Sequence, residues 1–170
     1  MSMTAKQALR STLRKLRAQI PLSKKRVAAR RAAIHALRLI ESKRARHVAV
    51  YQTMGSELDT APLRTKLRQR RLHIYLPRLQ GGCMGFTPRR SAEKMDVIFL
   101  PLLGFDAHGS RLGQGGGYYD RALSFARAFR RPLFVGYAYA VQQTDTLPRE
   151  PHDVRLDAVI TEKGLQWLTG

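Results

Sequence analysis

The chain has 170 residues, of which 31 are Lys or Arg and 12 are Asp or Glu, so its formal net charge at neutral pH is +19. Its 44 % hydrophobic residues suffice for a buried core, which excludes a wholly disordered chain. The sequence has no apolar run of the ~20 residues that span a membrane, no secretory leader, and a single cysteine, Cys83, which excludes an intrachain disulfide and favours the cytoplasm.

Two basic helices are predicted in the N-terminal part, within residues 4–41. The first ends at Pro21, and Ser23 can cap the second. Their apolar stripes consist of Ala5, Leu9, Leu13, Leu16 and Ile20, then of Val27, Ile34 and Leu37 with flanking alanines. Lys6, Arg10, Arg14 and Arg17 follow helical spacing and share a face of the first helix. That face is either solvated or binds an anion.

From residue 48 onward, short apolar runs alternate with helical stretches. Strands are predicted at residues 48–53, 72–77, 96–101, 132–138 and 157–161. Helices are predicted from Thr60 to about Arg71, from Tyr118 to about Arg130, and after residue 161, while residues 80–90 form a Gly- and Arg-rich connection. This order predicts one α/β domain over residues 1–170, with a mainly parallel sheet covered by helices on both faces and ligands at the carboxyl ends of the strands.

The glycine-rich segment 113–117 follows a buried strand and is the most informative part of the sequence. Its flexible backbone lets N–H groups converge on an anion at the start of the next helix. Arg111 adds a cation, and Asp120 adds a carboxylate suited to Mg²⁺. No Lys-Ser/Thr pair follows the glycines and residue 118 is Tyr, so the segment is neither a Walker loop nor a dinucleotide fingerprint. The alternative is a tight turn with a capping Asp.

Two further polar segments flank predicted strands. Met54, Glu57 and Asp59 follow the first strand, although Asp59 or Thr60 can instead cap the next helix. His152 and Asp153 lie in a Pro-bracketed loop before the last strand, where they can equally be surface and turn residues.

Four segments together resemble the 5-formyltetrahydrofolate cyclo-ligase family, also called methenyltetrahydrofolate synthetases. They are KQALR (6–10), MGSELDT (54–60), FDAHGSRLGQGGGYYD (105–120) and PHDVRLDAVIT (151–161), in that order over nearly the whole chain. The resemblance implies an ATP- and Mg²⁺-dependent enzyme that converts 5-formyltetrahydrofolate into 5,10-methenyltetrahydrofolate and releases ADP and phosphate. In that mechanism ATP phosphorylates the formyl oxygen, N10 of the folate attacks, and phosphate leaves.

The resemblance also implies roles for individual residues. Those implied to bind ATP are Lys6, Arg10, Arg111, Leu112, Gly113, Gln114, Gly115, Gly116, Gly117, Tyr118 and Tyr119. Those implied to bind the folate are Arg10, Met54, Glu57 and Asp59 together with residues 114–118. Arg111 and Tyr118 are the implied catalytic residues, and Asp120 and Asp153 the implied Mg²⁺ ligands. We expect a cytoplasmic monomer whose partner is a folate, polyglutamylated or not, and no specific nucleic acid or membrane.

Two alternatives to this activity stay open. The connection between the second and third strands is shorter than the family pattern and lacks its Glu-Pro segment, which suits a divergent member with another ATP- or folate-binding role. A basic nucleic-acid-binding module is indicated by a net charge of +13 in the first 46 residues and by Arg pairs at 30–31, 70–71, 89–90 and 130–131. However, no Phe, Tyr or Trp precedes Tyr51 to stack on bases.

Overall fold

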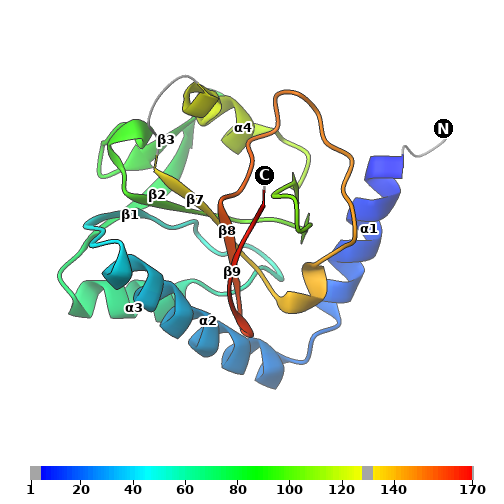
Figure 1. Cartoon of the computed structure of the whole chain (residues 1–170), viewed down its shortest axis with the longest axis horizontal. Coiled ribbons are helices and arrows are strands. Elements are labelled where there is room, and N and C mark those ends of the chain that lie inside the picture. The colour runs from blue at the N-terminus through cyan, green and yellow to red at the C-terminus, as the bar shows by residue number, and fades with distance from the viewer. Residues whose placement is uncertain (1–4, 128–131, 170) are drawn as a thin grey trace.

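A seven-stranded sheet forms the centre of the protein in a computed structural model that describes residues 5–127 and 132–169 (Figure 1). The strands are β1 (His47–Ala49), β2 (His73–Gln80), β3 (Cys83–Thr87), β4 (Val97–Leu100), β7 (Leu133–Tyr137), β8 (Ala158–Thr161) and β9 (Gly164–Trp167). Their order is β3-β2-β1-β4-β7-β8-β9. The five inner strands are parallel, and β3 and β9 add an antiparallel hairpin at each edge. The predicted mainly parallel sheet is therefore confirmed.

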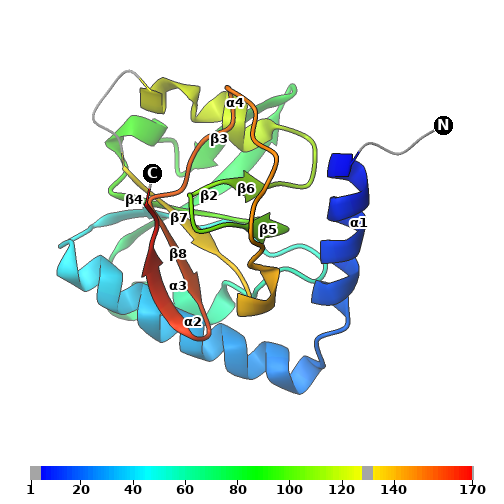
Figure 2. The ribbon, with the colours of Figure 1, turned by 45° about the vertical axis from the view of Figure 1, so that its right-hand side comes forward.

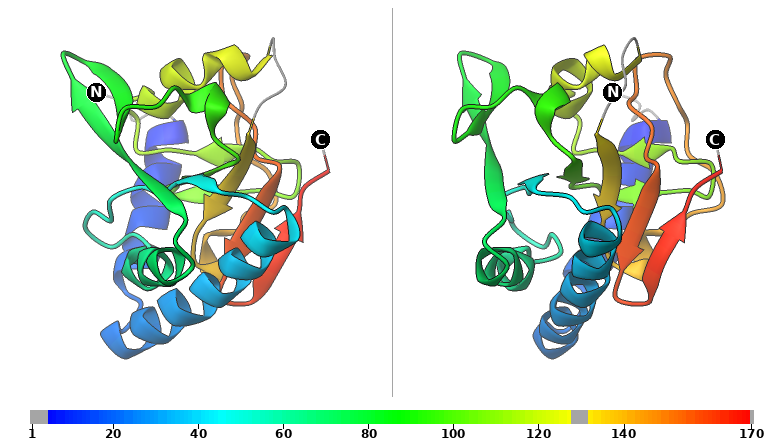
Figure 3. Two further views of the ribbon diagram at one scale, coloured as in Figure 1. Left: turned by 90° about the vertical axis from the view of Figure 1, so that its left-hand side faces the viewer. Right: turned by 60° about the vertical axis from the view of Figure 1, so that its left-hand side comes forward.

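Helices cover both faces of the sheet, as the three-layer prediction requires. The helices α2 (Leu22–Ser42) and α3 (Ala61–Gln69) pack on one face, and α4 (Tyr118–Ala122) lies on the other (Figure 3). Short 3₁₀ turns occur at η1 (Ala92–Lys94), η2 (Ser124–Arg127) and η3 (Ala140–Gln142). Within the described ranges, every helix is too short or too polar to cross a bilayer.

The first helix, α1 (Ala5–Ala18), lies at the side of the sheet (Figure 2). It packs against a separate small hairpin of β5 (Gly104–Phe105) and β6 (Arg111–Leu112). Leu13 of α1 is buried there with Leu103, Leu112 and Leu147. This contact brings the N-terminal cations to the segment that carries the glycines.

The buried face of α2 agrees with the prediction only in part. The flanking alanines are buried as predicted, and Leu39 and Ile40 are buried as well. Leu37 is buried as predicted, whereas Val27 and Ile34 are 50 % and 41 % exposed. The alanines let the helix approach the sheet closely, and Leu37, Leu39 and Ile40 bury larger side chains near its C-terminal end. Ser23 does not cap this helix, because the helix begins at Leu22 with Pro21 at the cap position.

Three predicted segments are also different in the structure. Residues 80–90 are not a plain connection but include β3, which pairs with β2 through a turn at Gly81 and Gly82, both at positive φ. The predicted closing helix is instead the strand β9, paired with β8. The helix predicted to reach Arg130 ends at Ala122 and gives way to η2, while residues 128–131 lie outside the described part of the chain.

Candidate active site

A cavity of about 820 Å³ lies where the parallel strands end at their carboxyl side. Its walls come from α1, the loop after β1, the glycine segment and the loop before β8. The residues with predicted roles that line it are Lys6, Arg10, Met54, Glu57, residues 111–120 and Asp153. Asp59 is the one residue with a predicted role that does not line it. Four segments far apart in the sequence thus meet in one place.

The glycine segment needs its glycines for two physical reasons. Gly115 and Gly117 have φ values of 112° and 62°, a region that other residues rarely adopt. At Gly116, a Cβ atom would lie 2.6 Å from the Tyr118 ring. The helix that follows is only five residues long, so its dipole is small. The attraction for an anion therefore comes from the loop amides and nearby cations rather than from the predicted helix.

Arg111 and Asp120 form a nearly buried ion pair at the base of this segment. Arg111 Nη2 lies 2.6 Å from Asp120 Oδ1, and the two side chains are 4 % and 18 % exposed. The same Oδ1 accepts a hydrogen bond of 3.0 Å from Val154 N, which leaves Oδ2 without one among the described residues. Arg111 Nε is buried without a hydrogen-bond partner. An anion in the cavity would give this cation the acceptor that it lacks.

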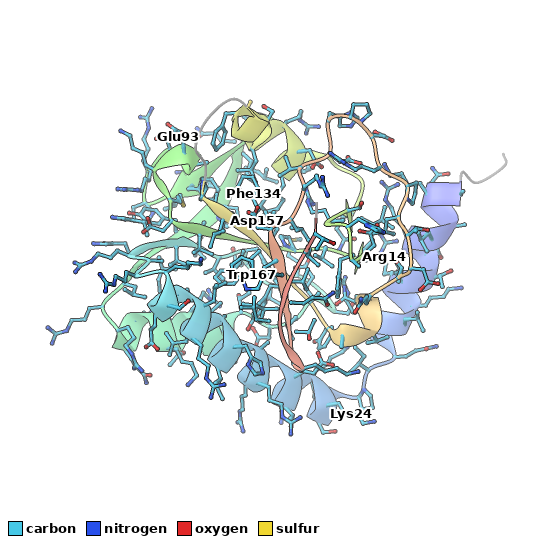
Figure 4. All side chains as sticks on the ribbon, in the orientation of Figure 1. Arg14, Lys24, Glu93, Phe134, Asp157 and Trp167 are labelled. Carbon is cyan, nitrogen blue, oxygen red and sulfur yellow. The ribbon has the colours of Figure 1, made fainter. Side chains whose placement is uncertain are left out.

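The four cations of α1 all hydrogen-bond to the rest of the protein, although Arg14 is itself exposed. Arg10 Nε donates to Gly113 O at 3.1 Å, and Arg14, labelled in Figure 4, donates from Nη2 to Gln114 Oε1 at 3.1 Å. Arg17 is buried and donates to Leu102 O, and burial lowers the pKa of its guanidinium. Lys6 Nζ pairs with Glu150 at 2.9 Å and with Asp153 at 3.7 Å. The interpretation of this face as merely solvated is therefore wrong.

A cluster of possible metal ligands lies beside Lys6. The ligand atoms of Glu150, His152 and Asp153 lie within 4.8 Å of one another. The hydrogen bond to Lys6 lowers the pKa of Glu150, so this carboxylate is readily ionised. Two carboxylates are a donor set that suits Mg²⁺. Sequence reasoning missed Glu150, although the residue lies only three positions before Asp153 in the Pro-bracketed loop.

Asp120 is not a member of that acidic cluster, but it lies in the same cavity. Its hydrogen bond from Val154 N ties it to the residue directly after Asp153. The two predicted Mg²⁺ ligands therefore share one cleft beneath the glycines, which is the arrangement that the prediction requires.

The opposite wall of the cavity is less charged. Glu57 is 8 % exposed; its Oε2 accepts a hydrogen bond from Met54 N at 2.9 Å and its Oε1 one from Gln114 Nε2 at 3.5 Å. Burial, and then the charge of Glu57, raises the pKa of Tyr119 well above its usual value. An apolar strip of Pro77, Leu79 and Met84 from the β2–β3 hairpin completes the wall. Sequence reasoning missed this strip because it predicted the first strand of the hairpin but took residues 80–90, which include β3, for a connection.

Asp59 points to the start of α3 instead. Its Oδ1 accepts hydrogen bonds from Ala61 N at 2.9 Å and from Thr53 Oγ1 at 3.4 Å. These contacts satisfy a backbone N–H at the helix start, as the capping alternative predicts.

Comparison with known proteins identifies the family. The model of the 5-formyltetrahydrofolate cyclo-ligase family matches residues 2–86 and 84–162. The two matches overlap at residues 84–86, within β3.

Similar proteins carry the same name or its synonym. The 5-formyltetrahydrofolate cyclo-ligase of Haemophilus influenzae is 31 % identical over 92 % of this chain and 97 % of its own length. That of Escherichia coli K12 is 33 % identical over 71 % and 80 %. The solved 5,10-methenyltetrahydrofolate synthetase of Aquifex aeolicus superposes with a TM-score of 0.83 at 28 % identity, over 98 % of this chain and 94 % of the other. By sequence and by fold, this chain belongs to the 5-formyltetrahydrofolate cyclo-ligase family.

Proposed function

We propose that this protein converts 5-formyltetrahydrofolate into 5,10-methenyltetrahydrofolate at the expense of ATP, with Mg²⁺ as its metal ion and ADP and phosphate as the other products. Family membership supports the folate conversion. One observation supports the use of a nucleotide: the glycine loop, three cations and four carboxylates line a single cavity.

The chemistry of this reaction explains why backbone amides, cations and carboxylates are sufficient for catalysis. A formamide carbon is a poor electrophile, so the formyl oxygen first attacks the terminal phosphorus of ATP and ADP leaves. N10 of the folate then attacks the activated carbon, the bond from that carbon to the phosphorylated oxygen breaks, and phosphate departs. No step needs a nucleophile from the enzyme. The protein must align the two substrates and neutralise negative charge.

We assign these tasks to residues on both sides of the cavity. Lys6, Arg10 and Arg111 neutralise the phosphates, and Asp120 holds the Arg111 guanidinium in place through their 2.6 Å ion pair. The glycine loop supplies backbone N–H groups, and Tyr118 positions the reacting groups from the loop's end. Asp153, Glu150 and the free Oδ2 of Asp120 would hold Mg²⁺. When bound, Mg²⁺ adds charge neutralisation at the phosphates.

The folate is assigned to the opposite wall. Met54, Glu57 and Gln114 offer polar contacts, and the strip of Pro77, Leu79 and Met84 offers an apolar surface for its aromatic rings. Asp59 is not assigned a contact with the folate. Its role is to accept a hydrogen bond from Ala61 N at the start of α3. The protein is proposed to act as a monomer in the cytoplasm.

A steady-state assay of methenyl-folate absorbance tests the proposal. Purified protein with 5-formyltetrahydrofolate, ATP and Mg²⁺ should produce the absorbance, and omission of ATP or addition of EDTA should abolish it. Folded protein that binds 5-formyltetrahydrofolate without turnover would contradict the proposal and favour the divergent family member.

A further inference from the structure

We propose that the edge of the sheet opposite the cavity binds single-stranded nucleic acid. This edge, at the amino ends of the parallel strands, is called the amino edge below. Its members are Lys43, Arg44, Arg46, His47, Arg70, Arg71, His73 and Trp167. The proposal goes beyond the folate reaction and does not depend on it.

Two chain turns bring the cations of the amino edge together. Lys43, Arg44 and Arg46 follow α2, and Arg70 and Arg71 follow α3. The turns are neighbours, because β1 and β2 start in register with His47 opposite His73, and His73 N donates to Arg46 O at 2.9 Å. All five cations are exposed.

Nearby acids leave most of this charge unpaired. Glu41 forms an ion pair with Arg70, with an N–O distance of 3.0 Å. Asp96 Oδ2 accepts hydrogen bonds from the backbone N–H groups of Arg46 and His47 rather than from a cationic side chain. Within residues 5–127 and 132–169, the other four cations of the amino edge form no ion pair with a carboxylate.

The backbone at two of these cations favours a ligand-binding role. Arg44 and Arg71 have φ values of 51° and 55°, and they are the two non-glycine residues at positive φ among those described. Glycine is the residue that normally ends a helix in this conformation, since a side chain there is strained. Both turns nevertheless place an arginine at the same point, directly after the residue that caps the helix. Strain of this kind concentrates where a side chain has a function.

Exposed rings lie among the cations. Trp167 is 50 % exposed, and Lys43 Nζ lies 5.0 Å from the centre of its ring (Figure 4). The rings of His47 and His73 stack at 4.7 Å with an angle of 8° between them, and His73 is exposed. The N-terminal part lacks aromatic residues of its own, but the fold brings Trp167 to it from the other end of the chain.

Cations combined with exposed rings are the pattern that binds single strands. The cations hold phosphates, and unpaired bases stack on the rings irrespective of sequence. A duplex keeps its bases stacked on one another and cannot use the rings. The chemistry of the amino edge therefore points to single-stranded RNA or DNA rather than to a duplex or a polyanion without bases.

The chain has one tryptophan, so fluorescence reports this site alone. We expect an oligothymidylate of about 12 nucleotides to quench Trp167 saturably, with affinity that falls as salt rises by a slope of about −0.7 per phosphate contact. A duplex of equal length and inorganic polyphosphate should leave the fluorescence unchanged. Equal quenching by the duplex, or binding without quenching, would overturn the proposal.

Variants locate the binding, measured by anisotropy of a labelled oligonucleotide. Arg44→Gly with Arg71→Gly removes two cations and suits the backbone, so the protein should stay folded while affinity falls about tenfold. The matched control, Lys24→Gln with Arg31→Gln, removes two exposed cations from the first half of α2 and should change affinity less than twofold. Lys24 lies about 28 Å along the helix from Lys43, at the far end of α2 (Figure 4).

A second pair of variants tests stacking. Trp167→Ala should weaken binding about 5- to 150-fold, and Trp167→Phe should restore most of the loss. Equal losses in the two double variants, Arg44→Gly with Arg71→Gly and Lys24→Gln with Arg31→Gln, would mean diffuse charge attraction. Full affinity of Trp167→Ala would mean that no base stacks there. Either result, or no binding at all, would refute the proposal, while the cyclo-ligase assay stays independent of all of them.

Discussion

Asp120 combines two tasks that a single substitution can separate. In Asp120→Asn, the amide oxygen still accepts the hydrogen bond from Val154 N, but the charge that faces Arg111 is lost. We expect turnover to fall about 100-fold or more and the Mg²⁺ requirement to rise. The free energy of unfolding should fall by about 1–3 kcal/mol, because a buried guanidinium loses its counter-charge. Mg²⁺ titrations of kcat and urea unfolding measure both effects. An unchanged Mg²⁺ response would remove Asp120 from the metal site.

His47 makes stability depend on pH. Burial first, and then the charges of Arg90 and His73, lower the pKa of this imidazole below its usual value. The unfolded chain then binds a proton more readily, with a pKa of about 6.5. The contribution of His47 is therefore present above that pH and is lost as pH falls below it. The groups that face the ring are Tyr75, His73, Arg90, Asp96 and Arg46.

We expect His47→Asn to flatten the dependence of urea stability on pH between about 7 and 5. His108→Asn, a substitution on an exposed loop, serves as the control and should keep the dependence. If the two variants behave alike, the slope comes from other groups.

At the scale of residues, the sequence predicted best where residue type and chain context agree. Arg111, the glycines and Asp120 occur together in one loop after a buried strand, and they line the cavity. Asp59 has a carboxylate that could contact the substrate, but its Oδ1 instead accepts a hydrogen bond from the backbone N–H of Ala61, two residues later. Glu150 was missed because nothing local distinguishes it. Only the fold brings Lys6 to it, across 144 residues.

At the scale of elements, α1 acts as one wall of the site and joins the hydrophobic core through Leu13. Lys6→Ala with Arg10→Ala should raise the KM for ATP about tenfold or more. The free energy of unfolding should change by less than about 1 kcal/mol, because the ion pair of Lys6 is partly exposed. Lys15→Ala removes an exposed cation from the same helix and should have no kinetic effect. A large loss of stability with unchanged kinetics would make these two cations structural.

The glycine loop gives a second prediction for an element. A Cβ atom at Gly116 would overlap the Tyr118 ring, so Gly116→Ala should displace this ring and lower kcat about tenfold or more. Tyr118 is 41 % exposed and has room to move, so thermal stability should change little. Gly85→Ala is the control, because a Cβ atom there meets nothing within 4 Å and φ is not positive. Equal activities of the two variants would show that the position of Tyr118 is unimportant.

How well each element could be predicted depends on whether its own residues or its neighbours in the fold determine its structure. Inner strands such as β4 and β8 are continuous apolar runs, which any packing of the sheet must bury, so the sequence located them. The edge strands β3 and β9 have mixed exposure and depend on their hairpin partners. Their signal lay in the turns, at Gly81 and Gly82 and at Gly164, rather than in periodicity. On α2, Val27 and Ile34 are exposed while the alanines face the sheet. The sequence alone does not show which of these apolar residues face the sheet, because that depends on how the helix packs.

At the scale of the whole molecule, the net charge of +19 opposes compaction. Raising ionic strength from 0.01 M to 0.1 M shortens the screening length from about 30 Å to about 10 Å. We therefore expect the Tm to rise by a few degrees over this range of NaCl. The variant Lys24→Gln with Arg31→Gln should show a higher Tm at low salt and a smaller rise. Calorimetry measures both, and a Tm that falls with added salt would mean that ion pairs outweigh repulsion.

The contacts of α1 also set the order in which the protein can be completed during synthesis. Arg10 meets Gly113 across 103 residues, and Lys6 meets Glu150 across 144. At about 5–20 residues per second, the ribosome needs about 7–29 s to make the latter span. The basic helix α1 therefore cannot complete its contacts until Glu150 has been made, so the wall of the cavity that it forms is among the last parts to assemble.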